Sequence, residues 1–114
     1  MKDTDVELIK SFNNEALNLE ILAEEAAEVI QAKSKIMRFG LFDCHPKKGG
    51  ASNQQDLDRE IGEFLFMVDT LKLNGIVTTD GVRRGYDYKK GKLSKYYTYK
   101  QESEDGRVST SIKG

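Results

Sequence analysis

Two long stretches of the chain, 15–38 and 55–73, place apolar residues along one side of an ideal helix. The apolar positions of the first stretch are Ile21, Leu22, Ala26, Val29, Ala32 and Ile36. Those of the second stretch are Leu57, Ile61, Phe64, Met67, Val68 and Leu71. A glycine follows each stretch, Gly40 the first and Gly75 the second, and glycine often ends a helix. The pattern therefore predicts two long amphipathic helices.

Shorter helices are predicted on either side of this pair. Residues 5–12 fit a short first helix, and residues 80–96 fit a last helix that begins at the capping cluster Thr78-Thr79-Asp80. Residues 40–54 hold the single proline and the pair Gly49-Gly50, which predicts a loop between the long helices. We therefore expect an all-α protein.

The last residues of the chain differ in character. Tyr97 and Tyr99 alternate with polar residues, Glu104-Asp105-Gly106 is a turn signal, and apolar residues alternate again over 108–112. This pattern predicts a β-hairpin, and the alternative is a frayed polar tail. We thus divide the chain into a helical domain, residues 1–96, and a C-terminal tail or hairpin, residues 97–114.

Composition narrows the class of protein. With 38% hydrophobic and 32% charged residues, the chain of 114 residues suits a soluble helical domain. The single cysteine, Cys44, excludes an intramolecular disulfide and fits a reducing compartment. No apolar run is long enough to span a membrane, and the N-terminus lacks the apolar segment of a signal peptide. We therefore expect a cytoplasmic protein without a membrane partner.

Charge is unevenly distributed, although the net charge is only −1. Acidic residues concentrate in residues 1–31 and basic residues in residues 82–100. Such a pair of regions in one domain can bind a metal ion and a phosphate side by side. The alternative is two solvated faces that attract each other.

Four glutamates lie on or beside the apolar sides of the two long helices. Glu25 falls inside the first apolar arc with Glu28 at its edge, and Glu60 and Glu63 repeat this arrangement on the second helix. The members of each pair are three residues apart, so they are neighbours on one helix surface. If the apolar sides pack together, four carboxylates converge, and Mg²⁺ is a natural compensating cation. The alternative is that these side chains reach water at the helix edges.

Candidate phosphate-binding cations occur in two places. Lys35 shares the rotational stripe of Glu28, and Arg38 follows it. On the last helix, Lys92 is three residues from Lys89 and from Lys95, which makes a basic stripe suited to a phosphate chain. For any single one of these residues, the alternative is a solvated surface charge.

A candidate base pocket precedes the first pair of glutamates. Phe12 could stack on a base, and the amides of Asn13 and Asn14 could read its edge. Core packing explains the phenylalanine equally well.

Two motifs resemble those of a known enzyme family. Glu24-Glu25-Ala26-Ala27-Glu28 matches the EExxE motif of MazG-like nucleoside triphosphate pyrophosphohydrolases. Glu60-Ile61-Gly62-Glu63-Phe64-Leu65-Phe66 resembles their later ExxD motif. The resemblance covers residues 15–96, and the ordered pair of motifs is more specific than either motif alone.

The resemblance implies a helical bundle of the MazG and dimeric dUTPase type. Apolar residues that widen the first arc or lie outside the second, among them Ile30 and Phe66, predict that oligomerisation to a dimer or tetramer completes it. It implies hydrolysis of a nucleoside triphosphate to the monophosphate and pyrophosphate, with two or three Mg²⁺ ions per site that Mn²⁺ could replace. The family's catalytic metal ligands fall on Glu25, Glu28, Glu60 and Glu63, and Glu24 is a supporting residue. The family's polar positions on the last helix align best with Asp87 and Lys89.

The chain also departs from the family pattern. The family's Asp is Glu63 here, which is one methylene longer, and the loop between the motifs is long. The run 34–40 resembles short phage-type members, some of which prefer guanine nucleotides. This likeness implies a role in phage nucleotide metabolism, in the host cytoplasm, with dGTP or GTP as preferred substrate.

The sequence is also compatible with other functions. Phosphoribosyl-ATP pyrophosphatase shares the superfamily motifs, and a non-enzymatic helical adaptor would use the acidic and basic faces for a partner. A di-iron carboxylate bundle needs Glu-x-x-His pairs, whereas the only histidine, His45, lies in a loop. Nucleic acid is not an expected partner, because the tyrosines of residues 82–100 fit a core or interface equally well.

Overall fold

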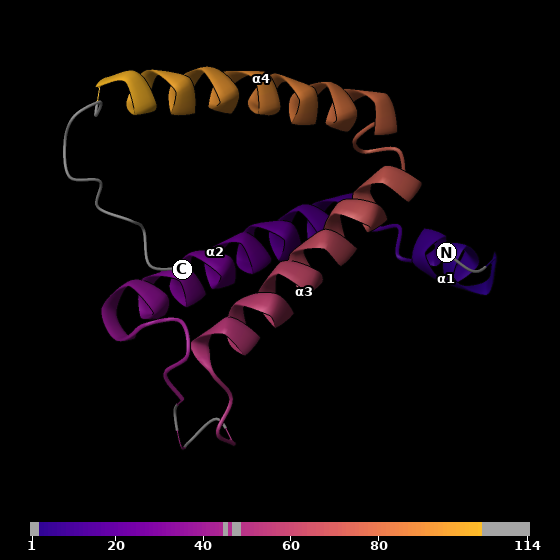
Figure 1. The fold of residues 1–114 in the computed structure, drawn as a ribbon. Coiled ribbons are helices and arrows are strands. Elements are labelled where there is room, and N and C mark those ends of the chain that lie inside the picture. Colours follow the sequence, from indigo (N-terminus) through magenta and orange to yellow (C-terminus); the bar gives the residue numbers. More distant parts are fainter. Residues whose placement is uncertain (1–2, 45, 47–48, 104–114) are drawn as a thin grey trace. The chain divides into compact units, whose positions relative to one another are not determined.

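A computed structural model describes residues 3–44, 46 and 49–103 of the chain. Four α-helices make up most of these residues (Figure 1). They are α1, Asp3–Ser11; α2, Glu15–Phe39; α3, Asn53–Leu73; and α4, Thr79–Ser103. Within the described ranges there is no β-strand, and an isolated bridge joins Cys44 to Ser52. The all-α prediction is therefore confirmed.

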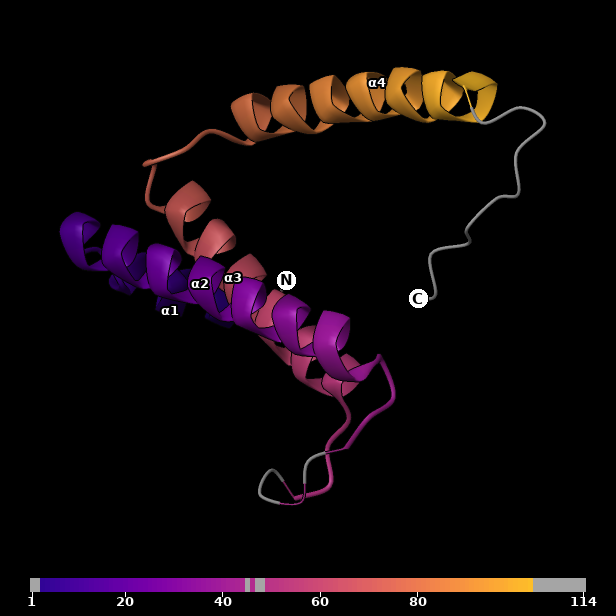
Figure 2. The same cartoon turned by 90° about the vertical axis from the view of Figure 1, so that its left-hand side faces the viewer.

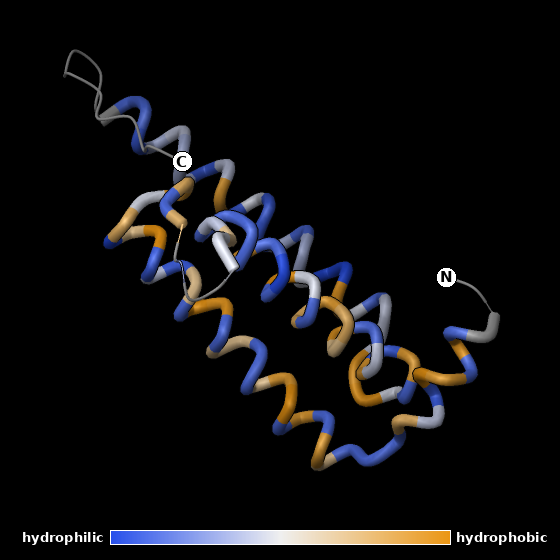
Figure 3. The backbone as a smooth tube through the Cα atoms, turned by 90° about the horizontal axis from the view of Figure 1, so that it is seen from below, coloured by the Kyte–Doolittle hydropathy of each residue, from blue (hydrophilic) through white to orange (hydrophobic). Residues whose placement is uncertain are grey.

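Helices α2 and α3 form an antiparallel hairpin, in which they lie side by side and cross at an angle (Figures 1 and 2). The loop between them is tied to the start of α3 by backbone hydrogen bonds, from Asn53 to Asp43 at 2.9 Å and from Gln54 to Leu41 at 2.9 Å. Apolar positions recur along both helices between hydrophilic ones (Figure 3). The buried hydrophobic residues of the described core are Ile9, Ala32, Met67 and Leu71.

Local capping explains where the long helices begin. The Asn14 side chain accepts a hydrogen bond from the Leu17 amide at 3.0 Å and so caps α2. Ser52 and Gln55 form a capping box at the start of α3, with reciprocal hydrogen bonds of 3.1 and 2.9 Å. Gly40 ends α2 with a φ of 94°, where its amide donates to the Ile36 carbonyl. Each N-cap contributes about 1 kcal/mol to stability.

The amide side chain of Asn74, at the end of α3, is hydrogen-bonded to the end of α1. Asn74 donates from Nδ2 to the carbonyls of Ile9, at 3.1 Å, and of Phe12, at 3.0 Å. The buried Asn18 of α2 donates to the same Phe12 carbonyl at 2.8 Å. These contacts fix the connection between α1 and α2 beside α3.

Helix α4 belongs to a second compact unit, because the chain divides between Ile76 and Val77. It extends through Ser103, so the predicted first strand of a C-terminal hairpin, from Tyr97 onward, is wrong. Helical contacts fix this segment, since Thr98 donates to the Ser94 carbonyl at 2.9 Å and the Lys100 ammonium lies 6.0 Å from the centre of the Tyr96 ring. The predicted turn and second strand lie outside the described residues. Helix α4 also runs unbroken across residues 96 and 97, where the sequence analysis divides the domains.

Candidate metal centre

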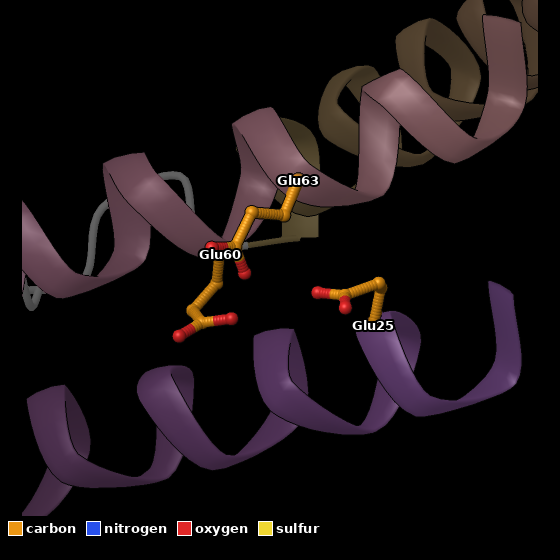
Figure 4. A group of neighbouring side chains, drawn as sticks. All are labelled: Glu25, Glu60 and Glu63. Atoms are coloured by element: carbon orange, nitrogen blue, oxygen red, sulfur yellow. The ribbon is translucent and has the colours of Figure 1, made fainter. Parts of the chain in front are cut away.

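Three of the four predicted glutamates meet between α2 and α3. Glu25 extends from α2, and Glu60 and Glu63 extend from α3 toward it (Figure 4). One carboxylate oxygen from each residue lies within 4.8 Å of the other two. The expectation that glutamates of the two helices converge is therefore confirmed for these three residues, which we call the carboxylate cluster.

Two oxygens of the carboxylate cluster are buried without a hydrogen-bond partner. They are Oε2 of Glu25 and Oε2 of Glu60. Glu60 is only 8% exposed, and Glu25 is half-buried. Burial of an unpartnered carboxylate oxygen is unfavourable by at least 1–3 kcal/mol, roughly, and more for a charged group. The cluster is thus a place where a cation would relieve an unfavourable arrangement.

One protein cation already contacts the cluster. Arg59 donates from Nη2 to Oε1 of Glu60 at 2.9 Å, and its Nη1 lies 3.7 Å from Oδ1 of Asp56. The hydrogen bond to Glu60 and the negative charge of Glu60 raise the pKa of Arg59, which stays protonated. Arg59 therefore compensates one oxygen of Glu60 and leaves the other without a partner.

The third carboxylate of the cluster titrates abnormally. The pKa of Glu63 is raised by partial desolvation, by its contact with the Glu25 carboxylate, and by the negative charge of Glu60. A raised pKa for a carboxyl group means that its ionised form is disfavoured by its neighbours. The same three groups that repel one another would all be stabilised by a shared cation.

The residues of the cluster fit Mg²⁺ in type and in spacing. Mg²⁺ prefers oxygen ligands at about 2.1 Å in octahedral geometry, so ligand oxygens on opposite sides of the ion are about 4.2 Å apart. The separation of 4.8 Å or less in the cluster requires only small movements of flexible glutamate side chains to reach this geometry. The donor set contains neither sulfur nor nitrogen, which favours a hard divalent cation.

Glu28 lies beside the cluster rather than in it. It is exposed, and it lines a hollow of about 230 Å³ between α2 and α3 together with Lys35, Arg59 and Glu60. Gln31, Ala32 and Asp56 complete the walls of this hollow. It holds two cations beside three carboxylates, and we call it the basic hollow after its cations. The structure thus places Glu28 and Lys35 next to the carboxylate cluster. Glu24 is exposed on α2.

Asp56 and Arg59 were missed by the sequence analysis. Asp56 is 3% exposed, one turn before Glu60 on α3. Its rotational position falls between those of Glu60 and Glu63, so helical periodicity could have identified it. Helical periodicity does not identify Arg59, because its position is exposed. Its contact with Glu60 depends on the conformation of its long side chain, which periodicity does not predict.

Arg38 and Asn14, which were also predicted to contact the substrate, each interact with another part of the protein. Arg38 places its guanidinium 5.2 Å from the centre of the Phe39 ring, and it does not line the basic hollow. Asn14 is the N-cap of α2. Asn14 also lines a largely apolar hollow of about 360 Å³ with Phe12 and Asn13, where the Phe12 and Phe66 rings meet edge to face at 6.5 Å. We call this the apolar hollow.

The predicted residues of α4 line shallow depressions on that helix. Asp87 and Lys92 border one of them, and Lys89 and Lys92 border the next. Asp87 forms an exposed ion pair with Arg83 at 3.3 Å. These residues belong to the second compact unit.

The arrangement in the first unit can hold a divalent cation, and the adjoining hollow carries two positive side chains among three carboxylates. None of the helices in the described part of the chain is both long enough and apolar enough to cross a membrane. Comparison of the chain with protein-family models, with curated proteins and with solved structures gave no match.

Proposed function

We propose that this protein is a Mg²⁺-dependent nucleoside triphosphate pyrophosphohydrolase. The observation that carries the proposal is the carboxylate cluster, in which Glu25 and Glu60 each bury an oxygen without a partner. The likeness of the segments 24–28 and 60–66 to MazG-like motifs supports the same chemistry. In the reaction, water attacks the α-phosphorus, the bond from this phosphorus to the bridging oxygen breaks, and pyrophosphate leaves.

In this proposal, each group of residues has a separate task. Glu25, Glu60 and Glu63 hold the metal, and Glu28 borders the site as a further carboxylate. Bound Mg²⁺ supplies charge neutralisation at phosphate oxygens and lowers the pKa of bound water. Lys35 lies beside the cluster in the basic hollow and offers positive charge to the triphosphate.

The apolar hollow is the proposed site of the base. Ile21 lines it one helical turn before Glu25, and Met67 lines it one turn after Glu63, so it adjoins the cluster at about 6 Å along each helix. Its volume of about 360 Å³ falls within the range of small-molecule sites, roughly 300–1,000 Å³. Phe12 offers an aromatic ring and Asn13 an amide, and a preference for dGTP or GTP remains part of the proposal.

Exposed apolar residues support the proposed dimer or tetramer. Ile30 and Met37 on α2 and Leu65 on α3 are all more than half exposed. Large exposed apolar surfaces often mark subunit interfaces. Light scattering at micromolar concentration tests this part of the proposal, and a monomer would contradict it.

A substrate panel tests the activity. Release of pyrophosphate from each of the common ribonucleoside and deoxyribonucleoside triphosphates is measured with Mg²⁺, with Mn²⁺ and with a chelator. Phosphoribosyl-ATP is included, because its preferential hydrolysis would assign the alternative activity. Glu60→Gln should abolish metal-dependent turnover, whereas Glu20→Gln, an exposed substitution on the same hairpin, should not change it. A helical adaptor would hydrolyse none of these substrates and would gain no stability from Mg²⁺.

A further inference from the structure

The basic hollow has a cation on each of its two walls, and the carboxylates of Glu28, Asp56 and Glu60 lie beside them. Lys35 lies on the α2 wall and Arg59 on the α3 wall, and Glu60 is shared between this hollow and the carboxylate cluster. An anion in the hollow would therefore lie next to whatever ion the cluster holds. The apolar hollow adjoins the opposite end of the cluster along both helices.

Arg59 contacts one oxygen of the Glu60 carboxylate, to which a metal ion in the cluster would also bind. Its guanidinium contacts Oε1 of Glu60 at 2.9 Å, while Oε2 of the same residue is buried without a partner. A divalent cation bound to Oε2 would compensate the charge of Glu60 and so weaken its attraction for Arg59. The Arg59 side chain is 58% exposed, so it can leave Glu60 without a large loss of packing.

We propose that Arg59 exchanges partners during binding: it neutralises Glu60 in the metal-free protein and contacts the leaving pyrophosphate once the metal ion holds Glu60. This inference rests on the proposed function and adds to it a pyrophosphate subsite in the basic hollow, between Arg59 and Lys35. It also gives the substrate a direction, with its base in the apolar hollow, its α-phosphate at the cluster and its terminal phosphates at Arg59.

The chemistry of the side chain suits this exchange. A guanidinium has five N–H donors in a fixed planar arrangement, and the two contacts to Glu60 and Asp56 use only some of them. Arginine binds phosphate oxygens in pairs, which a lysine cannot do in the same way. Helix geometry keeps Arg59 within one turn of both Asp56 and Glu63, so the exchange requires side-chain rotation alone.

The first test measures two affinities whose changes should have opposite signs. Arg59→Gln removes the competing cation, so Mg²⁺ alone should bind more tightly, by up to about fivefold for a largely exposed ion pair. Inorganic pyrophosphate, titrated at saturating Mg²⁺, should bind about ten- to a hundredfold more weakly. Arg59→Lys should retain part of the pyrophosphate affinity. Lys33→Gln, which removes the same charge from an exposed position on α2, should change neither affinity.

A double-mutant cycle without metal provides the second test. Glu60→Gln should release Arg59, so this variant should bind pyrophosphate more tightly than the wild type in the presence of a chelator. The gain should disappear in the double variant with Arg59→Gln. A gain of the same size in the double variant would overturn the exchange, and so would equal pyrophosphate affinities for Arg59→Gln and Lys33→Gln. Absence of Mg²⁺ binding by the wild type would instead refute the proposed function, so the two failures are distinguishable.

Discussion

Glu25→Gln should raise the stability of the metal-free protein and abolish its stabilisation by Mg²⁺. The substitution preserves the shape of the side chain and removes one of the three negative charges of the cluster. Two unit charges 4.8 Å apart repel each other by about 3.5 kcal/mol at an effective dielectric constant of 20. The half-buried position of Glu25 admits solvent screening, so we expect a net gain of about 1 kcal/mol from relief of the repulsion by Glu60. For a domain of this size, 1 kcal/mol corresponds to a rise in Tm of about 4–8 °C.

Thermal unfolding followed by circular dichroism, with a chelator and with excess Mg²⁺, measures both effects. At a Mg²⁺ concentration one hundred times its Kd, the wild type should gain about 2.7 kcal/mol, whereas the variant should gain little. The order of the two Tm values should therefore reverse when Mg²⁺ is added. Glu20→Gln, on the same helix and exposed, should follow the wild type in both conditions. A variant that is less stable without metal and equally stabilised by Mg²⁺ would refute the reasoning.

Three further predictions concern titration and helix ends. Because the folded pKa of Glu63 lies above its ordinary value of 4.5, the folded metal-free protein binds, at pH values between the two, a proton that the unfolded chain has released. Stability should therefore rise as the pH falls from neutral through the folded pKa, and Glu63→Gln should remove this contribution in unfolding experiments at a series of pH values. Asn14→Ala should lower the free energy of unfolding by about 1 kcal/mol, measured in urea, because α2 loses its N-cap. Asn74→Ala should increase hydrogen exchange in α1, because the carbonyls of Ile9 and Phe12 each lose a donor.

The sequence predicted the helices where periodicity and capping agreed. The long helices were expected at 15–38 and 55–73, and they are Glu15–Phe39 and Asn53–Leu73. The end of α4 was misjudged because Tyr97 and Tyr99 alternate with polar residues over only a few positions. Such a short alternation fits a strand, but the same residues also continue a helix, and helical propagation from the preceding turns decides between them.

The carboxylate cluster was predictable to the extent that helix geometry determines side-chain direction. Periodicity alone placed Glu25 and Glu60 on the sides that pack together, because each lies inside an apolar arc. Glu28 lies at the edge of its arc, and the crossing of α2 and α3 determines whether such an edge position reaches the cluster or the adjoining hollow. That crossing depends on packing between the helices, which no single helix pattern specifies. The contact of Arg59 with Glu60 depends in addition on a side-chain rotamer.

The cluster is unfavourable for folding, and this cost supports the proposed functional role. Stability alone would favour an apolar residue at the position of Glu60, since a buried charge pair is often less stabilising than a hydrophobic replacement of similar volume. The chain instead buries Glu60 beside Glu25 and Glu63 and leaves two oxygens without partners. Arg59, from a largely exposed position, compensates only one of the oxygens involved. Protonation of Glu63 relieves part of this unfavourable free energy at low pH. In the proposed function, a bound Mg²⁺ would recover more of it, because the ion would interact with all three carboxylates at once.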